Sequence, residues 1–144
     1  MIADRLVNYT ASRLNKAGTL TWSFRRGDVI PQFRQRFKDL IAELDEALPG
    51  LQFRKIKPST RTDLLIGYGD IPDGATSAAV WTDTRWEIRV PPRFFSTTVI
   101  RHELGHVLGL DHVPMGSRSI MAPSWNGYSD FTKQDLVALR AVWG

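Results

Sequence analysis

The pattern H-E-x-x-H-x-x-G-x-x-H is the feature that most constrains this chain. Residues four apart lie on the same face of a helix, so His102 and His106 can direct their imidazoles at one ion. Glu103 sits beside that face, within reach of a water molecule but not placed as a third ligand. Gly109 can adopt a positive φ, which would end the helix and let His112 return to the ion as a third nitrogen ligand.

Three protein ligands leave a fourth coordination position for water or substrate, which distinguishes a catalytic zinc site from a closed structural one. The chain has three histidines, and all of them fall in this pattern. The alternative is a helix that carries solvated or core histidines. The joint presence of Glu103 and Gly109 at the required spacing favours a site for one catalytic zinc ion.

Composition indicates one globular domain. The chain has 144 residues, of which 42% are hydrophobic and 24% are charged. This length is enough to bury a sizeable core without staples. The chain has no cysteine, which excludes disulfides, a thiolate zinc site and a cysteine nucleophile.

The location of the protein is not fixed by its sequence. No apolar run approaches the length of a membrane span, and the first twenty residues lack the apolar core of a signal peptide. We therefore expect no membrane partner.

Positive charge is concentrated in the first part of the chain. The net charge is +4, and residues 1–61 carry twelve Lys and Arg against six acids. Such a balance is compatible with binding to nucleic acid or to an anionic surface. However, the basic residues of 34–38 are followed by the acids of 39–46, and no aromatic-basic recognition motif accompanies them. This pattern favours a solvated helix face over a nucleic-acid interface.

Periodicity divides the chain into alternating strands and helices. Ser96 and Thr132 are candidate N-caps for the second and third long helices. Asp70 and Asp73 lie in a turn-rich loop, where calcium binding is possible but ordinary turn residues are the favoured interpretation. The ranges predicted as strands are 19–24, 51–56, 63–68, 76–81 and 86–90, and the long helices are predicted over 31–48, 97–108 and 131–143.

Two further segments carry a family resemblance. Ser-Ile-Met-Ala-Pro at 119–123 resembles the Met-turn of metzincin zinc proteases, and residues 131–144 resemble the closing helix of the matrixins. With the histidine pattern, the chain resembles a minimal matrixin (matrix-metalloproteinase-like) catalytic domain. The resemblance implies an α+β fold with a mixed, mostly parallel twisted sheet of about five strands. Two long helices, a backing helix and a zinc-motif helix, would precede the Met-turn and a C-terminal helix.

The resemblance also implies roles for individual residues. Met121 would support the zinc histidines from below, and Asp135 would brace the Met-turn. Pro123 and Trp125 fall where matrixins have a Pro-x-Tyr wall beside the scissile bond, and Ala79 falls on the strand that would receive the substrate. Three departures stand out: Trp125 replaces the tyrosine, Gln134 replaces an acid, and no histidines remain for a second, structural zinc.

The sequence therefore predicts a zinc-dependent endopeptidase in which Glu103 is the general base. The alternative is a catalytically silent, zinc-bearing module of the same fold that binds peptides. We expect a monomer whose partner is a polypeptide substrate, with extracellular location implied by family analogy alone. Residues 18–144 would form the catalytic domain. Residues 1–17 would form a short helix or arm, with inhibition by Asp4 on the metal as the less favoured alternative.

Overall fold

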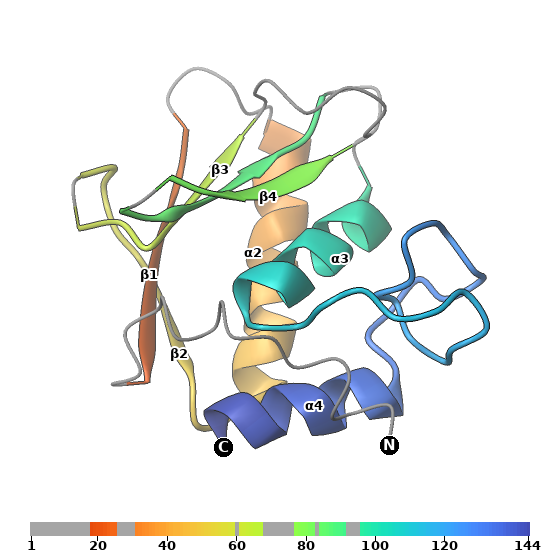
Figure 1. Ribbon diagram of the computed structural model, residues 1–144. Helices are drawn as coiled ribbons and strands as arrows, with labels where there is room; N and C mark the ends of the chain where they lie inside the picture. Colours follow the sequence, from red (N-terminus) through yellow and green to blue (C-terminus); the bar gives the residue numbers. More distant parts are fainter. Residues whose placement is uncertain (1–17, 26–30, 60, 68–76, 83, 92–95) are drawn as a thin grey trace.

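The computed structural model describes residues 18–25, 31–59, 61–67, 77–82, 84–91 and 96–144. They form one five-stranded sheet with three helices on it and beside it (Figure 1). The elements follow the chain as β1 Thr19–Phe24, α2 Pro31–Ala47, β2 Gln52–Lys55, β3 Leu64–Gly67, β4 Ala78–Trp81, β5 Trp86–Arg89, α3 Thr97–Val107 and α4 Lys133–Trp143.

The sheet has the strand order β2-β1-β3-β5-β4. Pairs β1–β2, β1–β3 and β3–β5 are parallel, and β4 runs antiparallel to β5 at one edge. The α+β class and the mixed, mostly parallel sheet of five strands are thus confirmed. Strand β4 lies at the edge of the sheet. It contacts α3, and it lines the cleft described below.

Helix α2 backs the sheet through an aromatic cluster. Its buried face recurs at three and four residues, as expected for an amphipathic helix. The Phe37 ring lies 5.0 Å from Trp22 and 5.7 Å from Phe24, both at edge-to-face angles. Burying each such side chain contributes about 1.5–3 kcal/mol, and the ring geometry adds about 0.5–1.5 kcal/mol per pair. This cluster fixes α2 against the sheet, and α3 in turn packs on α2.

Local capping sets the ends of the other two helices. The Ser96 hydroxyl accepts a hydrogen bond from the Val99 N–H at the start of α3. Thr132 and Asp135 form a reciprocal capping box at the start of α4. The other end of α4 is fastened by Trp143, whose indole N–H donates to the Leu108 carbonyl at 2.9 Å. Both predicted N-caps are confirmed, and α4 begins at Lys133 rather than at 131 because Thr132 is the cap.

The strand predicted at 19–24 matches β1 at both ends, and the other predicted boundaries agree with the structure within two residues. Helix α3 ends at Val107, and the strands at 51–56 and 76–81 are shorter than predicted. The N-terminal arm of residues 1–17, the Asp4 alternative and the Asp70/Asp73 calcium alternative lie outside the described residues. No helix in the described part of the chain is both long and apolar enough to cross a membrane.

Candidate metal and catalytic site

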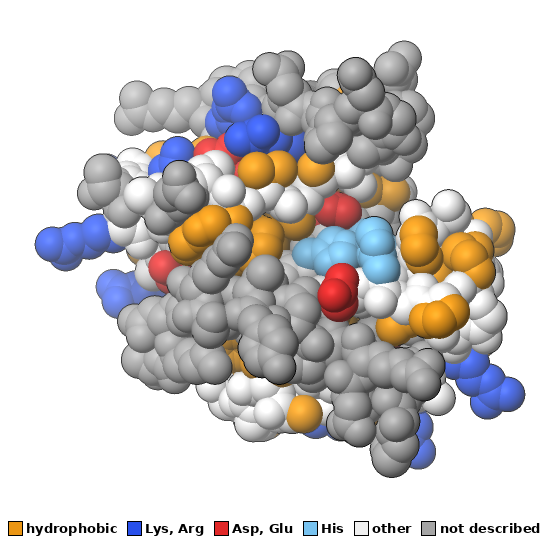
Figure 2. All heavy atoms as spheres, viewed as in Figure 1, with side chains coloured by type: hydrophobic (Ala, Val, Ile, Leu, Met, Phe, Trp, Pro, Cys, Tyr) orange, Lys and Arg blue, Asp and Glu red, His pale blue; other side chains and the backbone are white. Residues whose placement is uncertain are grey.

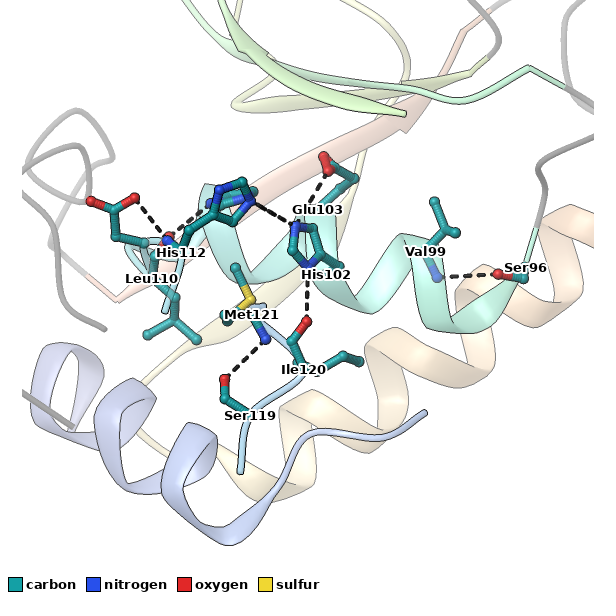
Figure 3. A network of polar contacts seen from close by, with 11 residues as sticks. Ser96, Val99, His102, Glu103, Leu110, His112, Ser119, Ile120 and Met121 are labelled. Atoms are coloured by element: carbon teal, nitrogen blue, oxygen red, sulfur yellow. Dashed lines mark hydrogen bonds and ion pairs between the residues drawn. The ribbon is translucent and has the colours of Figure 1, made fainter. Parts of the chain in front are cut away.

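The three histidines of the pattern converge on one point. Their Nε2 atoms form a nearly equilateral triangle with sides of 3.2 Å (His102–His106), 3.1 Å (His102–His112) and 3.1 Å (His106–His112). Tetrahedral zinc with Zn–N bonds of 2.0–2.1 Å requires nitrogens roughly 3.3 Å apart. The triangle therefore fits a single zinc ion (Figure 3).

Backbone carbonyls orient two of these rings. His102 Nδ1 lies 2.8 Å from the Ile120 carbonyl, and His106 Nδ1 lies 2.9 Å from the Leu110 carbonyl. Each carbonyl accepts the Nδ1–H, which leaves the lone pair on Nε2 facing the centre of the triangle. Burial lowers the pKa of His102 and lowers that of His106 to about 4. Both rings are therefore neutral near pH 7, as metal ligation requires.

A tight turn brings the third histidine into place. Gly109 has φ +108, a conformation that residues with a Cβ rarely adopt. Helix α3 ends just before it, at Val107, and the Leu110 N–H donates back to the Gly105 carbonyl at 2.8 Å. The backbone N–H of His112 donates to the Asp111 carboxylate at 2.8 Å, and the His112 side chain is exposed at the surface. The ligand triangle thus depends on a backbone conformation specific to glycine.

Glu103 occupies the wall beside the triangle. Its side chain is nearly inaccessible (residue 4% exposed), and Oε1 lies 4.0 Å from His102 Nε2. Oε2 is buried and has no hydrogen-bond partner among the described residues. Burial raises the pKa of Glu103 to about 7, although Ser77 and the backbone of Ala79 act in the opposite direction. A carboxyl group with this pKa can both take and return a proton near neutral pH.

The turn at 119–123 supports the triangle from below. Met121 is fully buried, and its sulfur packs so closely on Gly105 that a side chain there would overlap it. Asp135, also fully buried, accepts hydrogen bonds from the Ser119 hydroxyl, the Ile120 N–H and the Thr132 N–H. Since the Ile120 carbonyl in turn holds His102, a connected set of polar contacts joins α4 to the ligand triangle.

These elements surround a cleft of about 690 Å³. Figure 2 shows the histidines in the hollowed centre of this face, with hydrophobic side chains on either side of them. Ala79 of β4 lines the cleft, and so do Pro123, at the end of the 119–123 turn, and Trp125, just after it. Trp125 is 71% exposed, so its ring presents an apolar surface to whatever enters.

Comparison with known proteins agrees with this geometry. Residues 75–144 match the family model of the matrixins. This match is consistent with a matrixin-like metzincin catalytic domain. A search of the curated proteins found no match. The matched segment spans β4, β5, α3 and α4, so it includes every residue of the ligand triangle, and it indicates a zinc metalloprotease. The supporting half of the matrixin-like fold, from β1 to β3, lies before the matched segment.

Several residues that line the cleft were not predicted from the sequence as site residues. Ser77 and Tyr128 line it, and so does Asn126, whose side-chain amide donates to the Ser117 and Ser119 carbonyls at 3.1 Å. An asparagine in a loop rich in Gly, Ser and Pro is a signal for such backbone bracing. Gln134, which stands where an acid is usual, has a buried Oε1 without a partner in the described part of the chain.

Arg101, next to the first histidine, was also not singled out. Its guanidinium lies 3.0 Å from Glu43 of α2 and 3.0 Å from Asp130, and it donates to the Ser129 carbonyl at 3.2 Å. One side chain thereby links the backing helix, the motif helix and the loop that precedes α4. The contacts are too distant in sequence for local pattern to reveal, because Glu43 is 58 residues away.

Proposed function

We propose that this matrixin-like metzincin is a zinc-dependent endopeptidase in which Glu103 is the general base. One observation carries the proposal: in one open cleft, a buried Glu103 oxygen with no hydrogen-bond partner among the described residues stands beside three imidazole nitrogens spaced for one ion. A buried carboxylate oxygen left without a partner costs stability, so the retention of this one favours a chemical role over a structural one.

The residues divide the work of hydrolysis. His102, His106 and His112 would hold the ion, and a bound zinc supplies Lewis acidity that activates water and polarises a scissile carbonyl near neutral pH. Glu103 takes a proton from the attacking water while the water oxygen forms a bond to the carbonyl carbon. It then returns that proton to the leaving amide nitrogen as the C–N bond breaks.

The edge strand β4 is the proposed seat of the substrate. It is the last strand of the sheet, it is only half-buried, and Ala78 and Ala79 line the cleft. An extended polypeptide can add to such an edge through main-chain hydrogen bonds, which are largely independent of side-chain identity. We propose residues 18–144 as the catalytic domain, with residues 1–17 as an extension to it.

The test is cleavage of an unstructured protein such as casein, with and without a zinc chelator. We expect chelation to abolish cleavage and Glu103→Ala to lower the rate by at least ~100-fold, while metal analysis finds zinc retained in the variant. Glu46→Ala, which removes an exposed acid of α2, is the matched control and should leave the rate unchanged. Equal rates for wild type and Glu103→Ala would refute the mechanism. Bound zinc without cleavage by the wild type would favour the peptide-binding module.

A further inference from the structure

One side of the catalytic cleft is formed by a short segment without regular secondary structure. Residues 123–128 begin at the last residue of the 119–123 turn, and all of them except Gly127 line the cleft. Figure 1 shows the chain between α3 and α4 as loops that project beside α3. We call residues 123–128 the wall loop. Because neither a helix nor a sheet holds this loop, its position must depend on other contacts.

Hydrogen bonds fasten the wall loop through one side chain. The amide nitrogen of Asn126 donates to the Ser117 and Ser119 carbonyls, both at 3.1 Å. It also lies 3.4 Å from the Met115 carbonyl. No other hydrogen bond joins the wall loop to the described part of the chain. A primary amide nitrogen carries two hydrogens, which these three acceptors share, so the attachment depends on a single group.

The acceptors connect the wall loop to the ligand triangle. Ser119 and Ile120 are successive residues of the turn beneath the histidines (Figure 3). The Ser119 carbonyl accepts from Asn126, and the next carbonyl, that of Ile120, accepts from His102 Nδ1 at 2.8 Å. The Ser119 hydroxyl also donates to the buried Asp135 of α4, which fixes this turn. Two adjacent peptide groups thus hold the wall loop and a metal ligand in a fixed relative position.

Neighbouring side chains of the wall loop face opposite ways. Asn126 is half-buried and directs its amide toward residues 115–119, whereas the Trp125 side chain before it is exposed and lines the cleft. Gly127 follows with φ +100, a conformation that suits glycine, so the chain turns directly after Asn126. The placement of the exposed ring therefore depends on the hydrogen-bonded residue next to it.

We propose that Asn126 is a positioning residue for substrate binding: its amide holds the wall loop, and with it the Trp125 ring, beside the ligand triangle. The proposal rests on the endopeptidase function above. Asn126 acts through the wall loop and not on the reacting atoms. A loop that samples several positions must be ordered when a substrate binds, and this cost lowers the affinity. Loss of the amide should therefore raise KM for a polypeptide, with little effect on kcat or on zinc.

The first experiment compares Asn126→Asp with the wild type in the cleavage of casein. The substitution keeps the shape of the side chain but replaces the donor nitrogen by an oxygen that faces three carbonyls. We expect KM to rise roughly 3–10-fold, kcat to stay within about 2-fold, and zinc content to be unchanged. Asn126→Gln keeps an amide donor and should recover part of the lost affinity. Gln52→Glu makes the same chemical change at an exposed site of β2, at the opposite edge of the sheet from β4, and should leave KM unchanged.

A double variant separates positioning from a general loss of stability. Trp125→Ala alone should raise KM by a similar factor, because it removes the ring that Asn126 places. If the two residues act as one unit, Trp125→Ala/Asn126→Asp should raise KM about as much as the larger of the two single effects. A rise close to the product of the single effects would overturn the proposal, because independent contributions multiply.

Binding is measured separately, so that a failure of the proposed function can be recognised. Zinc-loaded Glu103→Ala is titrated against fluorescein-labelled casein and followed by anisotropy, which requires no cleavage. Adding Asn126→Asp should weaken this binding roughly 3–10-fold, whereas adding Gln52→Glu should not. If the wild type binds casein without cleaving it, the endopeptidase function fails, and this comparison still tests the positioning role. No measurable binding of casein, equal binding with and without Asn126→Asp, or a fall in kcat at unchanged KM would overturn that role.

Discussion

Two acidic side chains are buried in the described part of the chain, and their surroundings differ in kind. Asp135 of α4 accepts three hydrogen bonds, from Ser119 and Ile120 of the 119–123 turn and from Thr132. Glu103, on the cleft wall, keeps one oxygen without a partner among the described residues, and burial raises its pKa to about 7. The first carboxylate stabilises a turn, whereas the second is left available for proton transfer. Hydrogen-bond saturation separates a structural acid from a reactive one.

The largest expected effect on stability comes from replacing the Asp135 carboxylate, which accepts three hydrogen bonds. In Asp135→Asn the new amide group would face backbone donors, which leaves buried N–H groups unpaired. We expect a loss of about 2–4 kcal/mol of unfolding free energy. For a chain of this size, this loss corresponds to a fall in Tm of roughly 5–15 °C, measured by thermal unfolding.

The control for this substitution is Asp39→Asn, which alters an exposed acid that accepts a hydrogen bond from Gln35 one turn away. Its effect should stay within about 0.5 kcal/mol. A Tm for Asp135→Asn within a degree or two of the wild type would mean that the saturated contacts do not carry stability, and the contrast with Glu103 would lose its basis.

The next effect is the pH dependence of stability that arises from the Glu103 carboxylate, measured in metal-free protein. The pKa of Glu103 rises from 4.5 to about 7 on folding, so the folded state binds more protons than the unfolded state between these values. Wild-type stability should therefore fall as pH rises through this window, and Glu103→Gln should not share that fall. At about pH 8 the variant should be more stable than the wild type by about 2–3 kcal/mol, and near pH 4.5 the difference should vanish.

Denaturant unfolding at several pH values measures this difference. The lowered pKa values of His102 and His106 act in the opposite direction, since they cost stability as pH falls from 6.5 toward 4. They are common to both proteins and cancel in the subtraction. Glu46→Gln, which removes an acid at an exposed site, is the matched control for the substitution itself. A difference in stability between the wild type and Glu103→Gln that does not change with pH would show that Glu103 is not desolvated in solution.

Local sequence rules account for one part of the site and fail for another. The helical spacing of His102 and His106, the turn at Gly109 and the N-caps at Ser96 and Thr132 all follow from interactions within a few residues. The bond from His102 to the Ile120 carbonyl joins residues 18 apart, and the burial of Glu103 depends on β4. Such contacts arise only when separate elements pack together, so the periodicity of one segment cannot reveal them.

The same limit applies to charge. The excess of basic residues in 1–61 was interpreted as a solvated helix face, because Arg34 and Lys38 stand near acids in the sequence. In the structure, Arg34 is drawn together with Lys55 of β2, from a strand more than twenty residues later, over the Phe24 ring. Parallel strands align their C-terminal ends, and that alignment gathers charges that the linear sequence separates.

The smallest effect should come from Trp125, which lies on the loop that follows the saturated turn but points outward. Because this side chain is 71% exposed, Trp125→Ala should change Tm by about a degree or less. Its ring lines the cleft, so we expect KM for an extended substrate to rise roughly 3–10-fold, with kcat nearly unchanged. Met115→Ala is the matched control, since Met115 is 48% exposed but outside the cleft lining. It should leave both Tm and KM unchanged. A fall in kcat with KM unchanged would place Trp125 with Glu103 in the chemical step, whereas a large fall in Tm would place it with Asp135.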